Sequence, residues 1–168
     1  MDQPKGEESR SRLQDELRQG RPFHSKGQEA FLALLRTADV AKRRFTDLLD
    51  AEGVTLQQYN VLRILRGAGG DGLPTLEIAT RMIERTPGVT RIVDRLQAKG
   101  LAARGRRRDD RRRVWCQITS TGLELLAKLD DPVKKADGET VKGLSEDEVV
   151  RLIELLDRIR CTAEADLR

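Results

Sequence analysis

The chain has few of the residues from which catalytic, metal and disulfide sites are usually built. Histidine occurs once in the 168 residues, as His24, so histidine-based catalysis would depend on one residue in a peripheral segment. The two cysteines, Cys116 and Cys161, cannot build a disulfide framework and have no metal-ligand spacing. No uncharged apolar run approaches the roughly 18 residues of a membrane span, and the polar N-terminus is unlike a secretory signal. These absences predict a cytoplasmic protein that is not an enzyme, needs no cofactor and enters no membrane.

Charged residues, in contrast, make up 36% of the chain, where about 25% is usual. The 32 Lys and Arg residues outnumber the 28 Asp and Glu residues, which gives a formal net charge of +4. The excess lies in residues 104–113, whose sequence RGRRRDDRRR holds seven arginines against two aspartates. Guanidinium groups favour planar, two-point contacts with phosphates and base edges. This stretch is therefore a candidate for nucleic-acid contact, although by itself it is equally typical of a solvated loop.

The spacing of apolar residues predicts a mainly helical chain. Two helix starts carry a capping box, in which a Ser or Thr side chain and a Glu or Gln three residues later bond reciprocally to the backbone. These are Thr55 with Gln58, and Ser145 with Glu148. The predicted helices cover residues 28–49, 55 to the GAGGDG cluster, 75–83, 86–99, 120 until Pro132, Gly138 and Gly143 limit it, and 145 onwards.

The helices at 75–83 and 86–99 are joined by a tight turn and form a helix-turn-helix candidate. Leu76 is available for burial on the first helix. For the second, Thr86 is a good N-cap, and Pro87 suits the first helical position because its missing N–H costs nothing there. The second helix places Val89, Ile92, Val93 and Leu96 on one face, and Gly88, Thr90, Arg91, Asp94 and Arg95 on the other.

After this helix the hydrophobic period changes to that of a strand. The segment 101–104 is short and could be an extended strand. In residues 114–119 the side chains alternate between two faces, with Cys116 on one face and Trp115 on the other. Two short strands with an arginine-rich tip between them predict a β-hairpin, with Trp115 packed at its base. A helix-turn-helix followed by such a hairpin is a winged helix.

The predicted fold is therefore mainly α with a small β-hairpin wing: a winged helix-turn-helix with N- and C-terminal dimerisation helices. Residues 54–119 form the DNA-binding domain, 28–53 and 120–168 the dimerisation helices, and 1–27 a partly flexible extension. Both terminal helices carry wide apolar stripes that a small winged-helix core cannot fully cover. This favours a homodimer over the alternative, in which the two helices pack on each other within one monomer.

Residues 73–122 contain the segments LPTLEIATRM, TPGVTRIVDRLQAKGLAAR, DDRRRVWCQIT and STG. Together these segments resemble the DNA-binding region of the multiple antibiotic resistance regulator (MarR) family, and the flanking helices extend the resemblance to about residues 28–165. The family's wing signature has Asp, any residue and Arg, then Leu-Thr, then Gly. Here it reads Asp110, Arg111, Arg112, Ile118, Thr119 and Gly122, with Ile in place of Leu.

The resemblance implies a homodimeric transcription factor that binds double-stranded DNA at a palindromic operator. Each subunit would place the helix at 86–99 in the major groove and the wing in the adjacent minor groove. Arg91 or Arg95 suits a bidentate contact with guanine, whereas Arg85 and Lys99 are expected to meet phosphate or solvent. The predicted DNA-binding residues are Thr86, Gly88, Thr90, Arg91 and Arg95 on the helix, and Arg106, Arg107, Arg108, Asp110, Arg111 and Arg112 on the wing.

Members of this family commonly repress a promoter and release DNA when a small, often aromatic, ligand binds between the dimer helices and the winged-helix lobe. The polar candidates for such a site are Arg36, Asp39 and Arg43 on the first long helix and Tyr59 on the next. The first three also have the spacing of surface ion pairs, which is the favoured interpretation. The cysteine that peroxide-sensing members use, and the tryptophan that urate-sensing members use, are missing from the corresponding helices.

Three alternative functions can be distinguished from a ligand-responsive regulator. A constitutive DNA-binding protein would lack ligand control, and thermal-shift screening with aromatic acids would separate it from a ligand-responsive regulator. A winged-helix protein-interaction module would not lose affinity steeply with salt, as a DNA-binding protein does. An enzyme is disfavoured by the single histidine and by the lack of a nucleophile or metal motif.

Overall fold

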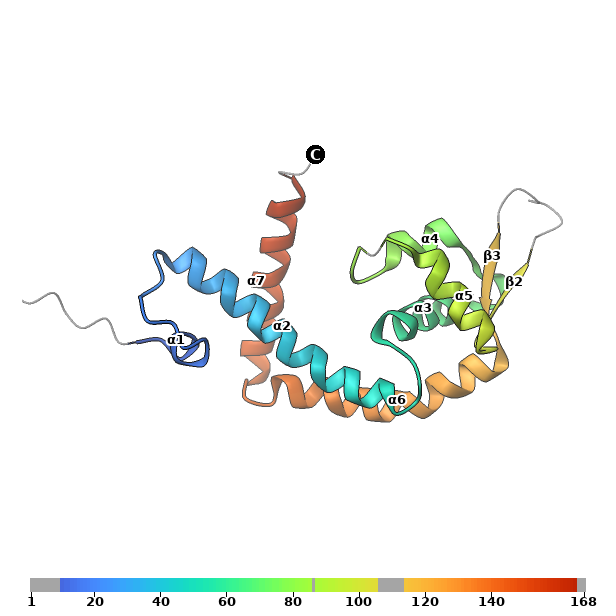
Figure 1. Ribbon diagram of the computed structural model, residues 1–168, viewed down its shortest axis with the longest axis horizontal. Coiled ribbons are helices and arrows are strands. Elements are labelled where there is room, and N and C mark those ends of the chain that lie inside the picture. Colours follow the sequence, from blue (N-terminus) through green and yellow to red (C-terminus); the bar gives the residue numbers. More distant parts are fainter. Residues whose placement is uncertain (1–9, 86, 106–113, 166–168) are drawn as a thin grey trace, which may run out of the picture. The chain divides into compact units, whose positions relative to one another are not determined.

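The computed structural model describes residues 10–85, 87–105 and 114–165, which form two compact units, Met1–Arg44 and Phe45–Arg168 (Figure 1). In the first unit, α1 (Arg12–Glu16) precedes α2 (Lys26–Asp50), whose last residues belong to the second unit. A capping box between Ser11 and Gln14 starts α1. The second unit contains α3 (Leu56–Gly67), the 3-10 turn η1 (Gly69–Asp71), β1 (Leu73–Pro74), α4 (Thr75–Arg81), α5 (Val89–Ala98), β2 (Ala102–Gly105), β3 (Trp115–Ile118), α6 (Ser120–Val141) and α7 (Glu146–Ala165).

The hydrophobic core of the second unit lies where α3 meets α5, α6 and the sheet. The apolar stripe predicted for the second helix of the helix-turn-helix is confirmed, because Val89, Ile92, Val93 and Leu96 are all buried. Asn60 is one of the few buried polar residues of α3, and its Oδ1 accepts a hydrogen bond of 3.1 Å from the backbone N–H of Ile83. This bond ties the turn after α4 to the core helix.

The predicted winged-helix class is confirmed by the sheet, which has three antiparallel strands in the order β1-β3-β2. The β2–β3 hairpin lies beside α5 (Figure 1). Trp115 is half-buried, but the prediction that it packs at the base of this hairpin is wrong, because it pairs with Gly105 at the loop end of the two strands and with Pro74 of β1 on its other side. The sequence pattern does not predict the strand β1, because a strand of two residues is too short to show alternation. This strand is preceded by Gly72 with φ +64°, where a Cβ would lie 2.4 Å from the Cys116 carbonyl oxygen.

Three sequence predictions for the helix-turn-helix are wrong in detail. The helix α5 begins at Val89 with Gly88 as its N-cap at φ +97°, so Pro87 precedes the helix and does not occupy its first position. A glycine adopts this left-handed conformation readily, and it ends the turn later than the Thr-Pro signal suggests. The first helix ends at Arg81, and Leu76, which was expected to be buried, is 79% exposed.

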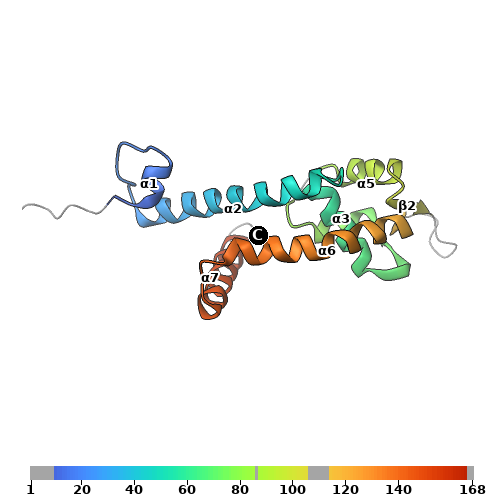
Figure 2. The same cartoon turned by 90° about the horizontal axis from the view of Figure 1, so that it is seen from below.

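The prediction that Pro132 limits the sixth helix is also wrong, because α6 runs without interruption from Ser120 to Val141 (Figure 2). A proline inside a helix removes one hydrogen bond and costs about 3 kcal/mol. Residues on both sides of it, Leu129, Val133 and Ala136, are buried. Tertiary packing of this face therefore outweighs the local penalty.

Both predicted capping boxes, at Thr55–Gln58 and Ser145–Glu148, are present.

Two glycines of α6 should respond to alanine with opposite signs. A Cβ on Gly122 would lie 2.3 Å from the Leu101 carbonyl oxygen and 2.7 Å from Cγ1 of Ile118. Gly122→Ala should therefore lower the free energy of unfolding by about 1–3 kcal/mol, the usual cost of overpacking. A Cβ on Gly138 meets nothing within 4 Å, so Gly138→Ala should raise that free energy by about 0.5–1 kcal/mol through its helix preference. Urea unfolding measures both, and stabilisation by Gly122→Ala would contradict the close approach.

Candidate nucleic-acid interface

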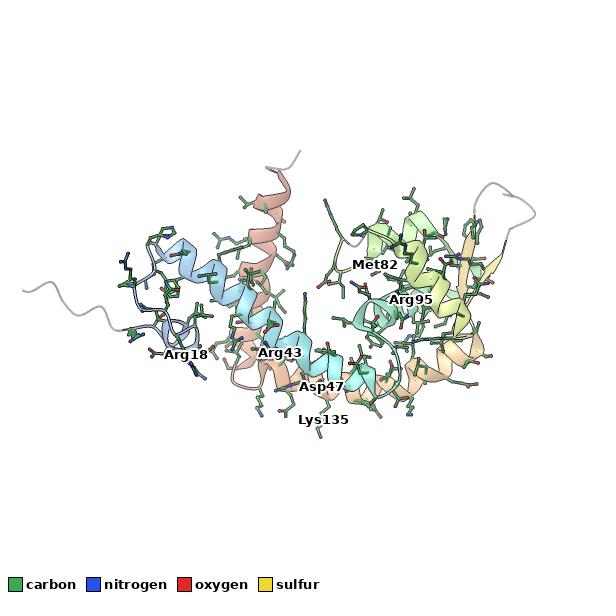
Figure 3. All side chains as sticks on the ribbon, viewed as in Figure 1. Arg18, Arg43, Asp47, Met82, Arg95 and Lys135 are labelled. Carbon is green, nitrogen blue, oxygen red and sulfur yellow. The ribbon has the colours of Figure 1, made fainter. Side chains whose placement is uncertain are left out.

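The exposed face of α5 carries the residues predicted to meet DNA bases. Thr90, Arg91 and Arg95 are exposed, while the opposite face of the same helix fills the core. Figure 3 shows Arg95 on this helix. Within the described part of the chain, the side chains of Arg91 and Arg95 make no hydrogen bond or ion pair, although most other described arginine side chains of the second unit do. Their guanidinium groups are therefore free to bind an external acceptor.

Arg104, counted in the sequence among the positive charges of the wing, is turned toward α5. Its Nη2 donates to the Thr90 carbonyl oxygen over 2.9 Å, and its Nη1 donates to the Asp94 carboxylate. The Arg104 side chain is only 21% exposed. Sequence reasoning missed this contact, because a ten-residue separation between a helix and a strand gives no periodic signal.

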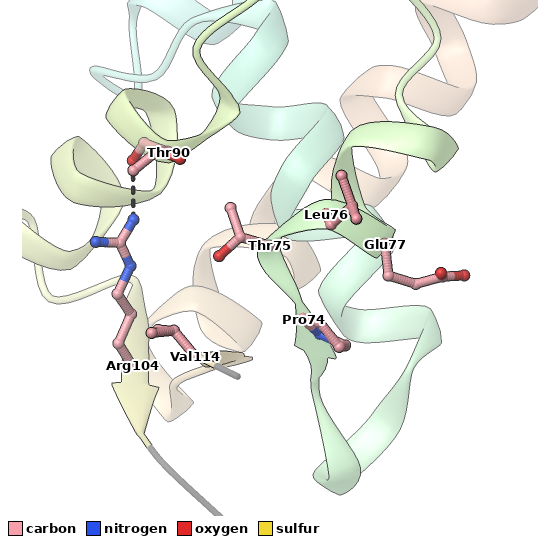
Figure 4. Close-up of a pocket in the computed structure, with 7 residues that line it drawn as sticks. All are labelled: Pro74, Thr75, Leu76, Glu77, Thr90, Arg104 and Val114. Atoms are coloured by element: carbon pink, nitrogen blue, oxygen red, sulfur yellow. Dashed lines mark hydrogen bonds between the residues drawn. The ribbon is translucent and has the colours of Figure 1, made fainter. Parts of the chain in front are cut away.

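An open cleft of about 490 Å³ lies where the starts of α4 and α5 meet the sheet, near the loop end of the β2–β3 hairpin (Figure 4). Leu76 and Val114 give it an apolar part that is exposed to solvent, and Arg104 and Thr90 give it a polar wall. The cleft therefore adjoins the predicted base-reading helix. Its lining residues are Pro74, Thr75, Leu76, Glu77, Thr90, Arg104 and Val114.

Lys99, expected to meet phosphate or solvent, has protein partners at the C-terminal end of α5. Its Nζ donates to the Gly53 carbonyl oxygen and, over 3.3 Å, to Oε1 of Gln58. The same Gln58 caps α3 together with Thr55. This contact links the end of α5 to the start of α3. Arg85 is exposed and, among the described residues, makes no ion pair.

The wing candidates and one helix candidate lie outside the described residues. The structure therefore positions only part of the predicted DNA-binding set, namely Gly88, Thr90, Arg91 and Arg95. The candidates outside the description are Thr86, Arg106, Arg107, Arg108, Asp110, Arg111 and Arg112.

Of the four ligand-site candidates, three are joined on α2. Asp39 Oδ2 lies 2.6 Å from Nη2 of Arg43 and 3.6 Å from Nη1 of Arg36, so these residues form the ion pairs that their spacing suggests. Tyr59 belongs to the second unit, where it is buried in the core. Burial raises the pKa of its hydroxyl, and the guanidinium carbon of Arg63 lies 5.9 Å from its ring centroid.

In the ranges 10–85, 87–105 and 114–165, no three His, Cys, Asp or Glu residues are grouped so as to hold a metal ion. Within the same part of the chain, no helix has both the length and the apolar character needed to cross a bilayer.

A helix-turn-helix whose second helix presents unpaired arginines, followed directly by a β-hairpin, defines a winged-helix protein. The sequence profile of the MarR family matches residues 52–113. The crystal structure of a MarR transcription factor from Planctomyces limnophilus is 38% identical, with a TM-score of 0.63 over 81% of this chain and 98% of that chain. The chain therefore belongs to the MarR family of transcriptional regulators.

Two other solved structures share the fold. A mutant of MarR from E. coli, complexed with operator DNA, is 25% identical, with a TM-score of 0.69 over 76% of this chain and 90% of that chain. BpsR from Bordetella bronchiseptica, whose DNA binding is regulated by 6-hydroxynicotinic acid, is 24% identical, with a TM-score of 0.71 over 83% of this chain and 98% of that chain.

Proposed function

We propose that the protein is a homodimeric repressor that binds a palindromic operator and leaves it when a small aromatic ligand binds. The observation that carries the DNA-binding part is the pair of unpaired guanidinium groups, Arg91 and Arg95, on the exposed face of α5. Arginine forms the commonest base-specific contact, a bidentate pair with guanine in the major groove. A regulator of this kind acts on DNA in the cytoplasm and needs neither catalysis nor a cofactor.

The arginine-rich stretch that begins within β2 supports the same role. Residues 104–113 hold the positive charge excess of the chain, and they begin six residues after the end of the base-reading helix. Arginines on a wing suit a narrow, electronegative minor groove, while additional arginines attract phosphates. We assign Arg112 to the minor groove, Asp110 to the organisation of the wing, and the remaining predicted wing arginines to phosphate attraction.

The homodimer is supported by the apolar residues that the terminal helices expose. On α7, Ile153 and Ile159 are 53% and 54% exposed, and none of the described side chains of this helix is buried. On α2, Phe31 and Val40 are similarly exposed. Exposed apolar residues repeated along a helix mark an interaction surface, and a second copy of the chain supplies a matching one. Residues 28–53 and 120–168 are therefore proposed as the dimerisation helices, and 54–119 as the DNA-binding domain.

Ligand control is supported by one relative, since 6-hydroxynicotinic acid regulates DNA binding by BpsR. For this chain, the candidate ligand-binding residues are those proposed from the sequence: Arg36, Asp39, Arg43 and Tyr59. A thermal-shift screen with aromatic carboxylic acids tests the assignment. An acid that stabilises the protein and lowers its operator affinity would support ligand control, whereas a screen in which no acid does both would favour the constitutive alternative.

The DNA-binding proposal is tested by selecting sequences from a random DNA pool and then measuring Arg91→Ala on the enriched operator. We expect a loss of about 1–3 kcal/mol and relaxed discrimination at one position of each half-site, because one bidentate base contact disappears. Arg63→Ala, which removes the same charge from the exposed surface of α3, is the matched control and should bind as the wild type does. Equal losses of Arg91→Ala on operator and random DNA would remove Arg91 from base reading.

A further inference from the structure

Arg104 is the one arginine of the 104–113 run that the structure describes, and its two terminal donors are already used inside the protein. Both terminal nitrogens of the guanidinium donate to α5, one to the Thr90 carbonyl oxygen over 2.9 Å and one to the Asp94 carboxylate. The third nitrogen, Nε, is buried without a hydrogen-bond partner. Figure 4 shows the guanidinium reaching from β2 to Thr90. Arg104 is therefore poorly placed to bind a phosphate itself.

The two contacts fix α5 at two successive turns. Thr90 lies in the first turn of the helix, and Asp94 follows four residues later on the same face. A planar fork that binds both points restricts sliding and rotation of this helix against the strand that begins the wing. Each anchored residue is followed directly by one of the unpaired arginines, Arg91 and Arg95. The positions of both base-reading residues therefore depend on the anchor.

The same contact changes the charge of the DNA-facing surface. Asp94 is exposed on the face that would approach the phosphates, where an uncompensated carboxylate would repel DNA. Arg104 offsets this charge from within the protein. Lysine would preserve the charge but not the two-point geometry, because its ammonium group is a single point charge on a flexible chain.

We propose that Arg104 is a positioning residue for DNA recognition, which holds α5 against the wing and offsets Asp94 without touching DNA. This inference rests on the proposed function for its consequence in DNA binding. The contact of Arg104 with Thr90 and Asp94 is a property of the free protein, so it can be tested both without DNA and with DNA.

The first arm uses hydrogen–deuterium exchange of the full-length protein without DNA. In Arg104→Gln, the amides of residues 89–98 should exchange faster than in the wild type, because the helix has lost its anchor. Arg66→Gln is the matched control: it removes the same charge and also breaks an Arg–Asp pair, 2.9 Å between Arg66 and Asp130, which joins α3 to α6. Exchange in α5 should be unchanged in this control. Unchanged exchange in Arg104→Gln would overturn the inference, whatever the protein does with DNA.

The second arm measures operator affinity of Arg104→Lys at several salt concentrations. Misplacing a bidentate base contact should weaken operator binding roughly 5- to 150-fold, with affinity for random DNA and the salt dependence kept. A direct phosphate contact predicts the opposite, since lysine replaces arginine well as a point charge for phosphate. Wild-type affinity of Arg104→Lys, or an equal loss on operator and random DNA, would contradict the inference. If the wild-type protein selects no sequence from the DNA pool, the proposed function is refuted. Hydrogen–deuterium exchange of Arg104→Gln would still show whether Arg104 anchors α5.

Discussion

A variant carrying Leu152→Glu and Leu156→Glu is expected to be a folded monomer. Both residues lie on α7, whose described side chains are all at least partly exposed in the single chain. A dimer that buries this helix would have to bury the new carboxylates, at a cost of several kcal/mol. Operator affinity should fall by about 100-fold or more, because two linked half-site contacts become two independent ones. Analytical ultracentrifugation gives the mass, and circular dichroism confirms that the monomer stays folded.

The matched control is Arg151→Glu, on the same helix, which introduces a carboxylate at a polar, exposed position. It should sediment as the wild type does. A double leucine variant that sediments as a well-folded dimer would place the dimer interface elsewhere and contradict the assignment of α7, within residues 120–168, to the dimer interface.

On the wing, alanine at Asp110 and at Arg112 is expected to weaken operator binding strongly, although the two substitutions change the charge in opposite directions. Arg112 is proposed to enter the minor groove, so its loss removes a direct contact. Asp110 is proposed to lower the repulsion among neighbouring arginines and to orient a guanidinium through a charge-assisted bond. Removing it should disorganise the wing, and this loss should exceed the gain from one fewer negative charge. Operator titrations at several salt concentrations measure both effects.

Asp109 supplies a control with the same charge change one residue away, because it lies outside the family's signature. Asp109→Ala should bind operator slightly more tightly, as simple charge attraction predicts. If Asp110→Ala is folded and also binds more tightly at every salt concentration, then Asp110 only repels DNA and has no organising role.

Local signals in the sequence predicted most of the fold. The capping box at Thr55 and the one at Ser145 are determined by contacts between residues three apart, and both occur as expected. The buried stripe of α5 follows from helical periodicity alone. The exposed arginines of this helix follow from the same periodicity, and their lack of partners within the described residues became visible only in the structure.

The features that were missed depend on contacts between distant parts of the chain. The Arg104 contact with Asp94 joins a strand to a helix, and the Lys99 contact with Gly53 spans 46 residues. Pro132 lies within a helix because its neighbours are buried, which local propensity does not include. The helix α5 begins at Val89 and not at the predicted Pro87, because Gly88 adopts a left-handed conformation. The Thr-Pro pair is the stronger local signal for a helix start, so the sequence pattern alone favoured the earlier residue.

The position of Trp115 gives the protein an optical reporter of its own. It is the only tryptophan of the chain, and it lies half-buried at the start of β3, where the wing loop rejoins the sheet, between Gly105 and Pro74. Indole emission depends on the polarity around the ring, so excitation at the red edge of its absorption selects a signal from this one place. Fluorescence titrations can therefore follow the wing during DNA or ligand binding without a label, a tag or any substitution.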